Sequence, residues 1–175
     1  LIAKSKLEND ICICSIFVNP TQFNNPTDFD KYPNTLNADL KALESLNCEI
    51  VFAPSAKEMY HELPKIKFDF GDLEQVMEGS NRPGHFNGVG IVVSKLFNIV
   101  RPNKAYFGQK DLQQFAIISQ LVKDLSFPIE LECCPTLREK DGLAMSSRNL
   151  RLNEMERKIL KKVFELTSEN RSWEK

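Results

Sequence analysis

Short, continuous runs of apolar residues recur along the chain, each bounded by proline, glycine or a cluster of polar residues. The first run is interrupted only by Ser15 and stops at Asn19-Pro20, where proline cannot donate a hydrogen bond to a neighbouring strand. Runs of this length are typical of strands that are covered on both faces. The strands predicted in this way span residues 11–18, 49–53, 104–107 and 129–135.

Between these runs, apolar residues recur at the spacing of a helix that buries one face. Two ranges rich in Asn, Pro or Gly, residues 21–33 and 80–90, are predicted to be loops instead. Residues 1–9 have the pattern of the end of a helix. A second helix is predicted to begin at Asn34 or Thr35 and to end at residue 46. Further helices are predicted over residues 72–78, where Gly79 ends the helix, and over 91–100 and 112–125. A final helix is predicted to begin at Asn153, with Glu156 in the position of a capping-box acid.

Alternating strands and helices predict an α/β fold with a mostly parallel sheet and flanking helices. In such sheets, ligands bind beyond the carboxyl ends of the strands, in the loops that follow them. Three loops qualify, which follow Val18, Phe107 and Pro135. We therefore expect the functional side chains to lie in these three loops.

Composition restricts the class of protein further. Of the 175 residues, 42% are hydrophobic and 27% are charged, which is ordinary for a globular protein and excludes a disordered chain. A net charge of −1 gives no overall attraction to nucleic acid or to anionic lipid. No apolar run is long enough to cross a bilayer, and charged residues precede the first run, so we expect a cytoplasmic protein without a secretory signal. The five cysteines have no Cys-x-x-Cys spacing, and we expect them to be reduced.

The loop after the first predicted strand contains Asn19 and Gln22. Their amide groups can both donate and accept hydrogen bonds, so they suit a small polar substrate with hydroxyl and carboxylate groups. An Asn-Pro pair also commonly opens a turn, and a structural role is the alternative interpretation.

The loop after the third predicted strand contains Gly108, Lys110 and Asp111. The glycine lets the backbone turn sharply towards a ligand. Lys110 stands at the start of a helix, where free N–H groups favour an anion and a cation is unfavourable for the helix itself. This local conflict favours a role for Lys110 in binding a phosphate. The alternative is an ordinary helix start with Asp111 as N-cap, and Gln114 lies one turn further along the same face.

The loop after the fourth predicted strand contains Ser146, Ser147 and Arg148. Two hydroxyl groups beside a guanidinium group form a compact anion-binding cluster, because the guanidinium can donate to two phosphate oxygens at once. A solvated loop of mixed charge is the alternative interpretation.

His85 lies in the glycine-rich range 80–90 and is a candidate general acid or base. A histidine in a loop more often serves only as a hydrogen-bonding group. Sequence alone leaves both interpretations open.

Four segments carry a resemblance to a known family: residues 15–23 (SIFVNPTQF), 78–86 (EGSNRPGHF), 107–114 (FGQKDLQQ) and 145–149 (MSSRN). In this order they resemble the pantoate–β-alanine ligase, or pantothenate synthetase, family. The resemblance implies a Rossmann-like domain of the nucleotidyltransferase superfamily. It also implies a ligase that condenses pantoate with β-alanine through a pantoyl-adenylate. The reaction would consume ATP with Mg²⁺, without a prosthetic group, and release AMP and pyrophosphate.

The resemblance implies three groups of site residues. Lys110 and Arg148 would stabilise the charge of the reacting phosphates. Gln22, Gln114 and Asn19 would bind pantoate or β-alanine. The ATP site would consist of Gly108, Gln109, Lys110, Asp111, Leu137, Met145, Ser146, Ser147 and Arg148, with no metal ion held by protein side chains.

The resemblance extends to the central part of the family. The family's His-x-Gly-His motif, which supplies a proton donor, and most of its carboxyl-terminal domain have no counterpart in the chain. We therefore predict a truncated Rossmann-like ATP- and pantoate-binding domain over residues 1–150 and a helix leading to a missing domain over 151–175. We expect the chain by itself to be an impaired or inactive ligase. The resemblance further implies a homodimer that binds small molecules and has no nucleic-acid or membrane partner.

Two other interpretations remain open. The chain could be a fragment of another nucleotidyltransferase or of an aminoacyl-tRNA synthetase, since residues 145–148 occupy the place of their mobile Lys/Ser loop. The absence of a basic stripe argues against an RNA partner. It could also be a non-catalytic nucleotide-binding remnant, which would bind ATP without forming an acyl-adenylate.

Overall fold

A computed structural model of the chain describes residues 1–23, 27, 29, 32, 35–146, 148–149 and 152–169. Ser147 and Asn34, named above, lie outside the described residues. The chain divides into two compact units, Leu1–Cys134 and Pro135–Lys175. The functional boundary at residue 150 stays a prediction.

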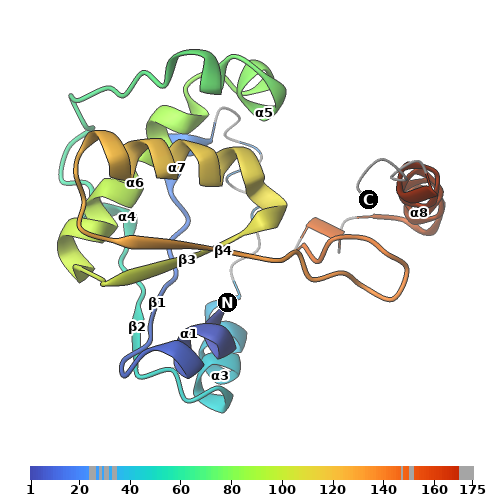
Figure 1. The fold of residues 1–175 in the computed structure, drawn as a ribbon, viewed down its shortest axis with the longest axis horizontal. Coiled ribbons are helices and arrows are strands. Elements are labelled where there is room, and N and C mark those ends of the chain that lie inside the picture. The colour runs from blue at the N-terminus through green and yellow to red at the C-terminus, as the bar shows by residue number, and fades with distance from the viewer. Residues whose placement is uncertain are drawn as a thin grey trace. The chain divides into compact units, whose positions relative to one another are not determined.

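The strands of the first unit form two parallel pairs (Figure 1). In the first pair, β1 (Ile13–Ser15) lies beside β2 (Ile50–Phe52), with Ile13 opposite Ile50. In the second pair, β3 (Lys104–Gly108) lies beside β4 (Glu130–Cys134). The predicted α/β fold with parallel strands is thereby confirmed.

The first predicted strand is shorter and less covered than its apolar run indicated. Only Ile13–Ser15 pair as a strand, and the Ile13 side chain is 37% exposed. Ile11 and Ile50 are exposed as well. The prediction of a strand buried on both faces is wrong, because Ile13 and Ser15, which point to the same side of β1, are exposed.

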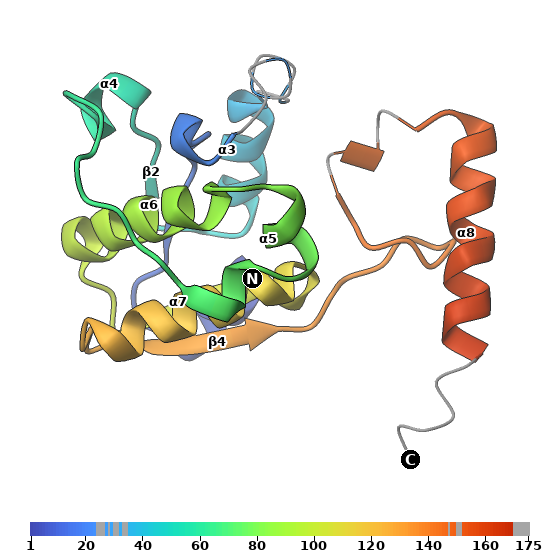
Figure 2. The same cartoon turned by 90° about the horizontal axis from the view of Figure 1, so that it is seen from above.

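Helices surround these strands (Figures 1 and 2). The predicted helices over residues 1–9, 35–46 and 112–125 are confirmed to within a few residues. The α-helices with described bounds in the first unit are α1 (Ile2–Glu8), α3 (Leu36–Ser45), α4 (Ala56–Met59), α5 (Met77–Asn81), α6 (His85–Val100) and α7 (Leu112–Asp124). Its 3₁₀ turns are η1 (Pro20–Gln22), η2 (Gly71–Glu74) and η3 (Gln109–Asp111).

The structure corrects the predicted helix over residues 72–78. The range is divided into η2 and α5, and Gly79 lies inside α5 rather than ending a helix. The division falls at Met77, whose φ of 50° is in the left-handed region. Gly79 packs directly on the backbone of Glu74, where a Cβ atom would clash. This close contact, and not a helix stop, is the structural need for glycine here.

The predicted loop over residues 80–90 is also wrong at both ends, because α5 continues to Asn81 and α6 begins at His85. Two glycines of the predicted loop lie inside this helix. A Cβ atom on Gly88 would lie 2.5 Å from the Thr21 carbonyl oxygen, and one on Gly90 would lie 2.9 Å from the Phe68 ring. Close packing against α6 therefore requires glycine where helix propensity disfavours it.

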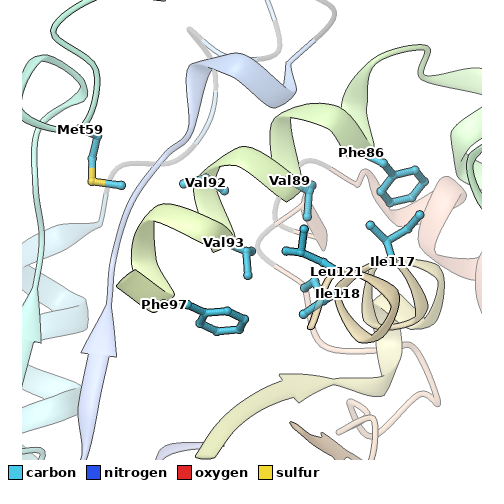
Figure 3. Close-up of a cluster of buried hydrophobic side chains, with 9 residues drawn as sticks. All are labelled: Met59, Phe86, Val89, Val92, Val93, Phe97, Ile117, Ile118 and Leu121. Atoms are coloured by element: carbon cyan, nitrogen blue, oxygen red, sulfur yellow. The ribbon is translucent and has the colours of Figure 1, made fainter. Parts of the chain in front are cut away.

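The core of the first unit lies where α6 and α7 face each other (Figure 3). Ile117 and Ile118 of α7 are completely buried. Phe97 of α6 extends the core towards the strands, with its ring centroid 6.5 Å from that of Phe107 on β3. The buried members of this cluster are Met59, Phe86, Val89, Val92, Val93, Phe97, Ile117, Ile118 and Leu121.

Ion pairs attach α1 to the second strand pair. Lys104 on β3 binds the Glu8 carboxylate at 3.0 Å, and Lys4 binds Glu132 on β4. The Tyr106 hydroxyl donates to Glu8 Oε2 at 2.8 Å. The hydrogen bond from Lys104, followed by that from Tyr106, lowers the pKa of Glu8, and Lys4 lowers the pKa of Glu132.

The second unit contains a tight hairpin and α8 (Glu154–Glu169). The predicted capping box is confirmed, since Asn153 Oδ1 accepts from Glu156 N and Glu156 Oε2 accepts from Asn153 N, both at 2.9 Å. Arg157 of α8 donates to Asp141 at 2.6 Å and also binds Glu139. Within the described parts of the chain, no helix is long and apolar enough to span a membrane.

Candidate functional site

The loop after β1 is organised around the Asn19 side chain, which is only 2% exposed. Its Oδ1 atom accepts from the Tyr60 hydroxyl and from Thr21 Oγ1, both at 2.9 Å. Its Nδ2 atom donates to Gln22 Oε1 at 3.1 Å and to the Gly88 carbonyl at 3.2 Å. Asn19 therefore holds the loop after β1 together, and its predicted role as a direct ligand stays a prediction.

Gln22 is half-buried on η1, and its contacts fix the orientation of its amide group. Because Asn19 donates to Gln22 Oε1, the network assigns the opposite end of the amide as the NH₂ group. That NH₂ group has no hydrogen-bond partner among the described residues. It is thus a donor suited to a carboxylate or hydroxyl oxygen, as the sequence predicts for a substrate ligand.

Two further side chains, from the end of α5 and the start of α6, contact the Gln22 backbone. His85 Nδ1 lies 2.9 Å from the Gln22 carbonyl oxygen, and Arg82 Nη2 donates to the same oxygen at 3.4 Å. A carbonyl can only accept, so Nδ1 of His85 carries the proton. His85 is 3% exposed, which matches the interpretation of a buried hydrogen-bonding group. Arg82 also forms an ion pair with Glu78.

The loop after β3 brings Lys110 and Asp111 to the surface at the start of α7. Lys110 Nζ donates to Asp111 Oδ1 at 3.0 Å. Asp111 occupies the N-cap position of α7, yet its side chain makes no capping hydrogen bond there. The alternative of an ordinary side-chain N-cap is therefore wrong, because the carboxylate binds Lys110.

Gly108 precedes this loop with an extended backbone. A Cβ atom at that position would meet nothing within 4 Å. The expected sharp turn does not occur, so no contact among the described residues requires glycine at position 108. Gln109 is exposed, and Gln114 is half-buried in the first turns of α7.

Sequence reasoning missed Gln113, which makes the most hydrogen bonds of the residues at the start of α7. Its Nε2 atom donates to the Leu73 and Val76 carbonyl oxygens at 2.8 and 2.7 Å. Its Oε1 atom accepts from the Glu78 and Gly79 amides at 2.9 and 3.4 Å. These partners precede Gln113 by more than thirty residues, so no local spacing rule identifies them.

A cavity of about 390 Å³ lies between the segment that Gln113 binds and the start of α6. Burial, together with the charge of Asp69, raises the pKa of Glu74 at its edge. The residues that line the cavity are Glu74, Gln75, Gly79, Ser80, Arg82, Pro83, Gly84 and Phe86. In the described part of the chain, no group of three His, Cys, Asp or Glu side chains is arranged to hold a metal ion.

The second unit holds the remaining predicted residues on its hairpin. Met145 N donates to the Leu137 carbonyl at 2.9 Å, and both side chains are largely exposed. Arg148 N donates to Ser146 Oγ at 3.3 Å, which places these two residues together. Ser147 lies outside the described residues. Hydrogen bonds thus connect Leu137 to Met145 and Ser146 to Arg148 within the second unit.

The fold and these loops define an α/β protein that presents amide and cationic side chains beyond the carboxyl ends of parallel strands, where such proteins bind small polar ligands. A protein-family model described as pantoate-beta-alanine ligase matches residues 1–172. The chain belongs to this family.

Relatives and solved structures agree with this assignment. The chain is 53% identical to a pantothenate synthetase of Cytophaga hutchinsonii over 96% of the chain and 59% of that protein. It is 49% identical to a pantothenate synthetase of Bacteroides fragilis over 99% of the chain and 61% of that protein. The chain therefore spans about 60% of the length of these relatives.

A crystal structure of pantoate-beta-alanine ligase from Francisella tularensis, complexed with beta-gamma ATP and beta-alanine, superposes with a TM-score of 0.90. It is 45% identical and covers 94% of this chain and 64% of the other. Pantothenate synthetase from Thermus thermophilus superposes with a TM-score of 0.89 at 41% identity, over 94% of this chain and 60% of the other.

Proposed function

We propose that the chain binds ATP, pantoate and β-alanine as part of a ligase that joins pantoate to β-alanine. The observation that carries the proposal is the family match over residues 1–172. The Francisella tularensis relative, which superposes closely, binds beta-gamma ATP and beta-alanine. The amide NH₂ of Gln22 and the ammonium group of Lys110 supply the donor and the cation that such substrates require.

The proposed reaction has two steps. A carboxylate oxygen of pantoate attacks the α-phosphorus of ATP, which is bound with Mg²⁺ as the substrate complex; the bond to the bridging oxygen breaks, and pyrophosphate leaves. The β-alanine amine then attacks the acyl carbon of the pantoyl-adenylate, loses a proton, and displaces AMP. Anionic groups meet in the first step, so fixed positive charge and correct positioning should dominate the rate.

We assign the residues the roles that the family resemblance implies. Lys110 and Arg148 would stabilise the phosphate charge, while Gln22, Gln114 and Asn19 would bind pantoate or β-alanine. The nucleotide would contact Gly108, Gln109, Asp111, Leu137, Met145, Ser146 and Ser147. Domain roles divided at residue 150, the homodimer and the cytoplasmic location stay predictions.

Calorimetry with separate ligands tests the proposal. Lys110→Ala should weaken ATP binding by at least about tenfold, because a charge-assisted contact to phosphate contributes about 1.5–3 kcal/mol. Gln22→Met, which keeps the side-chain shape and removes the amide, should weaken pantoate binding by about fivefold or more. Each variant should leave the other ligand's affinity nearly unchanged.

Lys123→Ala is the matched control, since Lys123 is an exposed lysine near the end of the same helix. It should bind both ligands as the parent does. Pyrophosphate release in the presence of ATP and pantoate then measures the first chemical step directly. A parent chain that binds neither ligand would refute the proposed function, whereas binding without pyrophosphate release would favour the nucleotide-binding remnant.

A further inference from the structure

Gln113 binds the backbone of the segment from Leu73 to Gly79, which is defined here as the wall segment. The two donors of its amide are directed at the Leu73 and Val76 carbonyls, and its oxygen receives the Glu78 and Gly79 amides. A glutamine amide offers two N–H donors and one oxygen with two lone pairs. Every hydrogen-bonding position of the side chain is therefore used in one place.

The wall segment needs this external support. It contains the irregular junction between η2 and α5, where Met77 adopts a φ of 50° that is unfavourable for a residue other than glycine. Val76, at the N-cap position of α5, makes no side-chain capping bond. Gln113 thus supplies from another helix the acceptor that the Glu78 amide would otherwise lack at the start of α5.

The position of the wall segment connects two of the candidate loops. Its residues Glu74, Gln75 and Gly79 line the 390 Å³ cavity, which Arg82 lines as well. Arg82 and His85, which follow α5, both contact the Gln22 carbonyl oxygen. Gln113 itself lies in α7, two residues after Asp111, which belongs to the loop that follows β3. A single side chain therefore links the loop after β3 to the residues that hold Gln22.

We infer that Gln113 is a positioning residue: it holds the wall segment so that Arg82 and His85 keep the backbone of Gln22 in place for binding of the hydroxy-acid substrate. This inference rests on the proposed function and adds a residue to it. Gln113 acts through the wall segment, and not through the loop after β3 that is proposed to bind ATP. Its loss should therefore impair pantoate binding selectively.

The first test follows the wall segment itself. Gln113→Met keeps the length of the side chain and removes its hydrogen bonds, and it should accelerate hydrogen exchange at the Glu78 amide by about fivefold or more. The matched control is Gln120→Met on the same helix, since Gln120 Nε2 donates only to Asp124 at 2.8 Å. This control should exchange at Glu78 as the parent does.

The second test measures both substrates by calorimetry. Gln113→Met should raise the Kd for pantoate by about fivefold or more while the Kd for ATP stays within about twofold. A purely structural role would weaken both ligands together and lower the unfolding temperature. Should Gln113→Met fail to fold, Gln113→Glu, which keeps the acceptor and lacks both donors, should show the same selective loss.

The outcomes separate this inference from the function on which it rests. Equal pantoate affinity in the variant and the parent, or equal losses for pantoate and ATP, would overturn the role of Gln113 while leaving the ligase proposal intact. A parent chain that binds neither substrate would overturn both. Unchanged hydrogen exchange at the Glu78 amide in Gln113→Met would show that Gln113 does not hold the wall segment, and this result would also overturn the inference.

Discussion

Replacing Gly88 by alanine sets two effects of opposite sign against each other. Gly88 lies inside α6, where alanine is the better helix former by about 1 kcal/mol. Yet a Cβ atom there would lie 2.5 Å from the Thr21 carbonyl oxygen and 2.8 Å from the Gln22 amide nitrogen. Both neighbours are backbone atoms, so no side-chain rotation can relieve the overlap.

The overlap should outweigh the gain in helix propensity. Forcing an extra methyl group into a packed contact costs about 1–3 kcal/mol. Moving α6 away from η1 also weakens the hydrogen bond from Asn19 to the Gly88 carbonyl, which contributes about 1 kcal/mol. After subtracting about 1 kcal/mol for helix propensity, we expect Gly88→Ala to destabilise the fold by about 1–3 kcal/mol.

Thermal unfolding followed by circular dichroism measures this effect. For a chain of this size, the expected loss lowers the unfolding temperature by about 2–10 °C. The matched control is Ser94→Ala in the same helix, because the Ser94 hydroxyl is buried without a partner among the described residues. Removing that hydroxyl should leave stability unchanged or raise it. If Gly88→Ala is as stable as Ser94→Ala, the close approach of α6 to η1 is not the reason for glycine.

Two further predictions concern stability. The folded pKa values of Glu8 and Glu132 lie below the ordinary value of 4.5, so their ion pairs stabilise the fold above about pH 4.5 and this contribution is lost as the pH falls. The unfolding temperature should therefore drop on acidification, and the drop should be smaller in Glu132→Gln; an identical pH profile would contradict this. Asn153→Ala removes the capping box of α8 and should cost about 1 kcal/mol, measured by urea unfolding monitored at the helix signal, whereas Asn153→Asp should retain the stability.

The sequence predicts elements well where local pattern and packing agree. The apolar run before Gly108 and the periodic apolar residues after it both form the expected elements. The prediction fails over residues 85–90, because Gly88 and Gly90 are required by neighbouring backbone and rings that lie far away in sequence. Local propensity carries no information about such a neighbour, so the pattern predicts a loop where the chain forms a helix.

The candidate site shows the same limit. The types of residue at the strand ends are evident from the sequence, and Asn19, the N-cap of η1, does contact Gln22 at the end of η1. The supporting residues are not evident, because Tyr60 is 41 residues from Asn19 and Gln113 is 35 residues from Glu78. Side chains that orient other side chains follow from tertiary structure alone.

The pairing of Lys110 with Asp111 has a consequence for ligand selectivity. In the described structure the ammonium group is already neutralised by an adjacent carboxylate at 3.0 Å. A phosphate that bound Lys110, as proposed, would therefore exchange with a carboxylate and not merely with water. Weakly charged molecules gain little from such an exchange, whereas a polyanion gains from every additional negative oxygen. Under the proposed function, the Asp111 carboxylate would compete with phosphate oxygens for this ammonium group, so binding at this position would favour ligands that carry several negative charges.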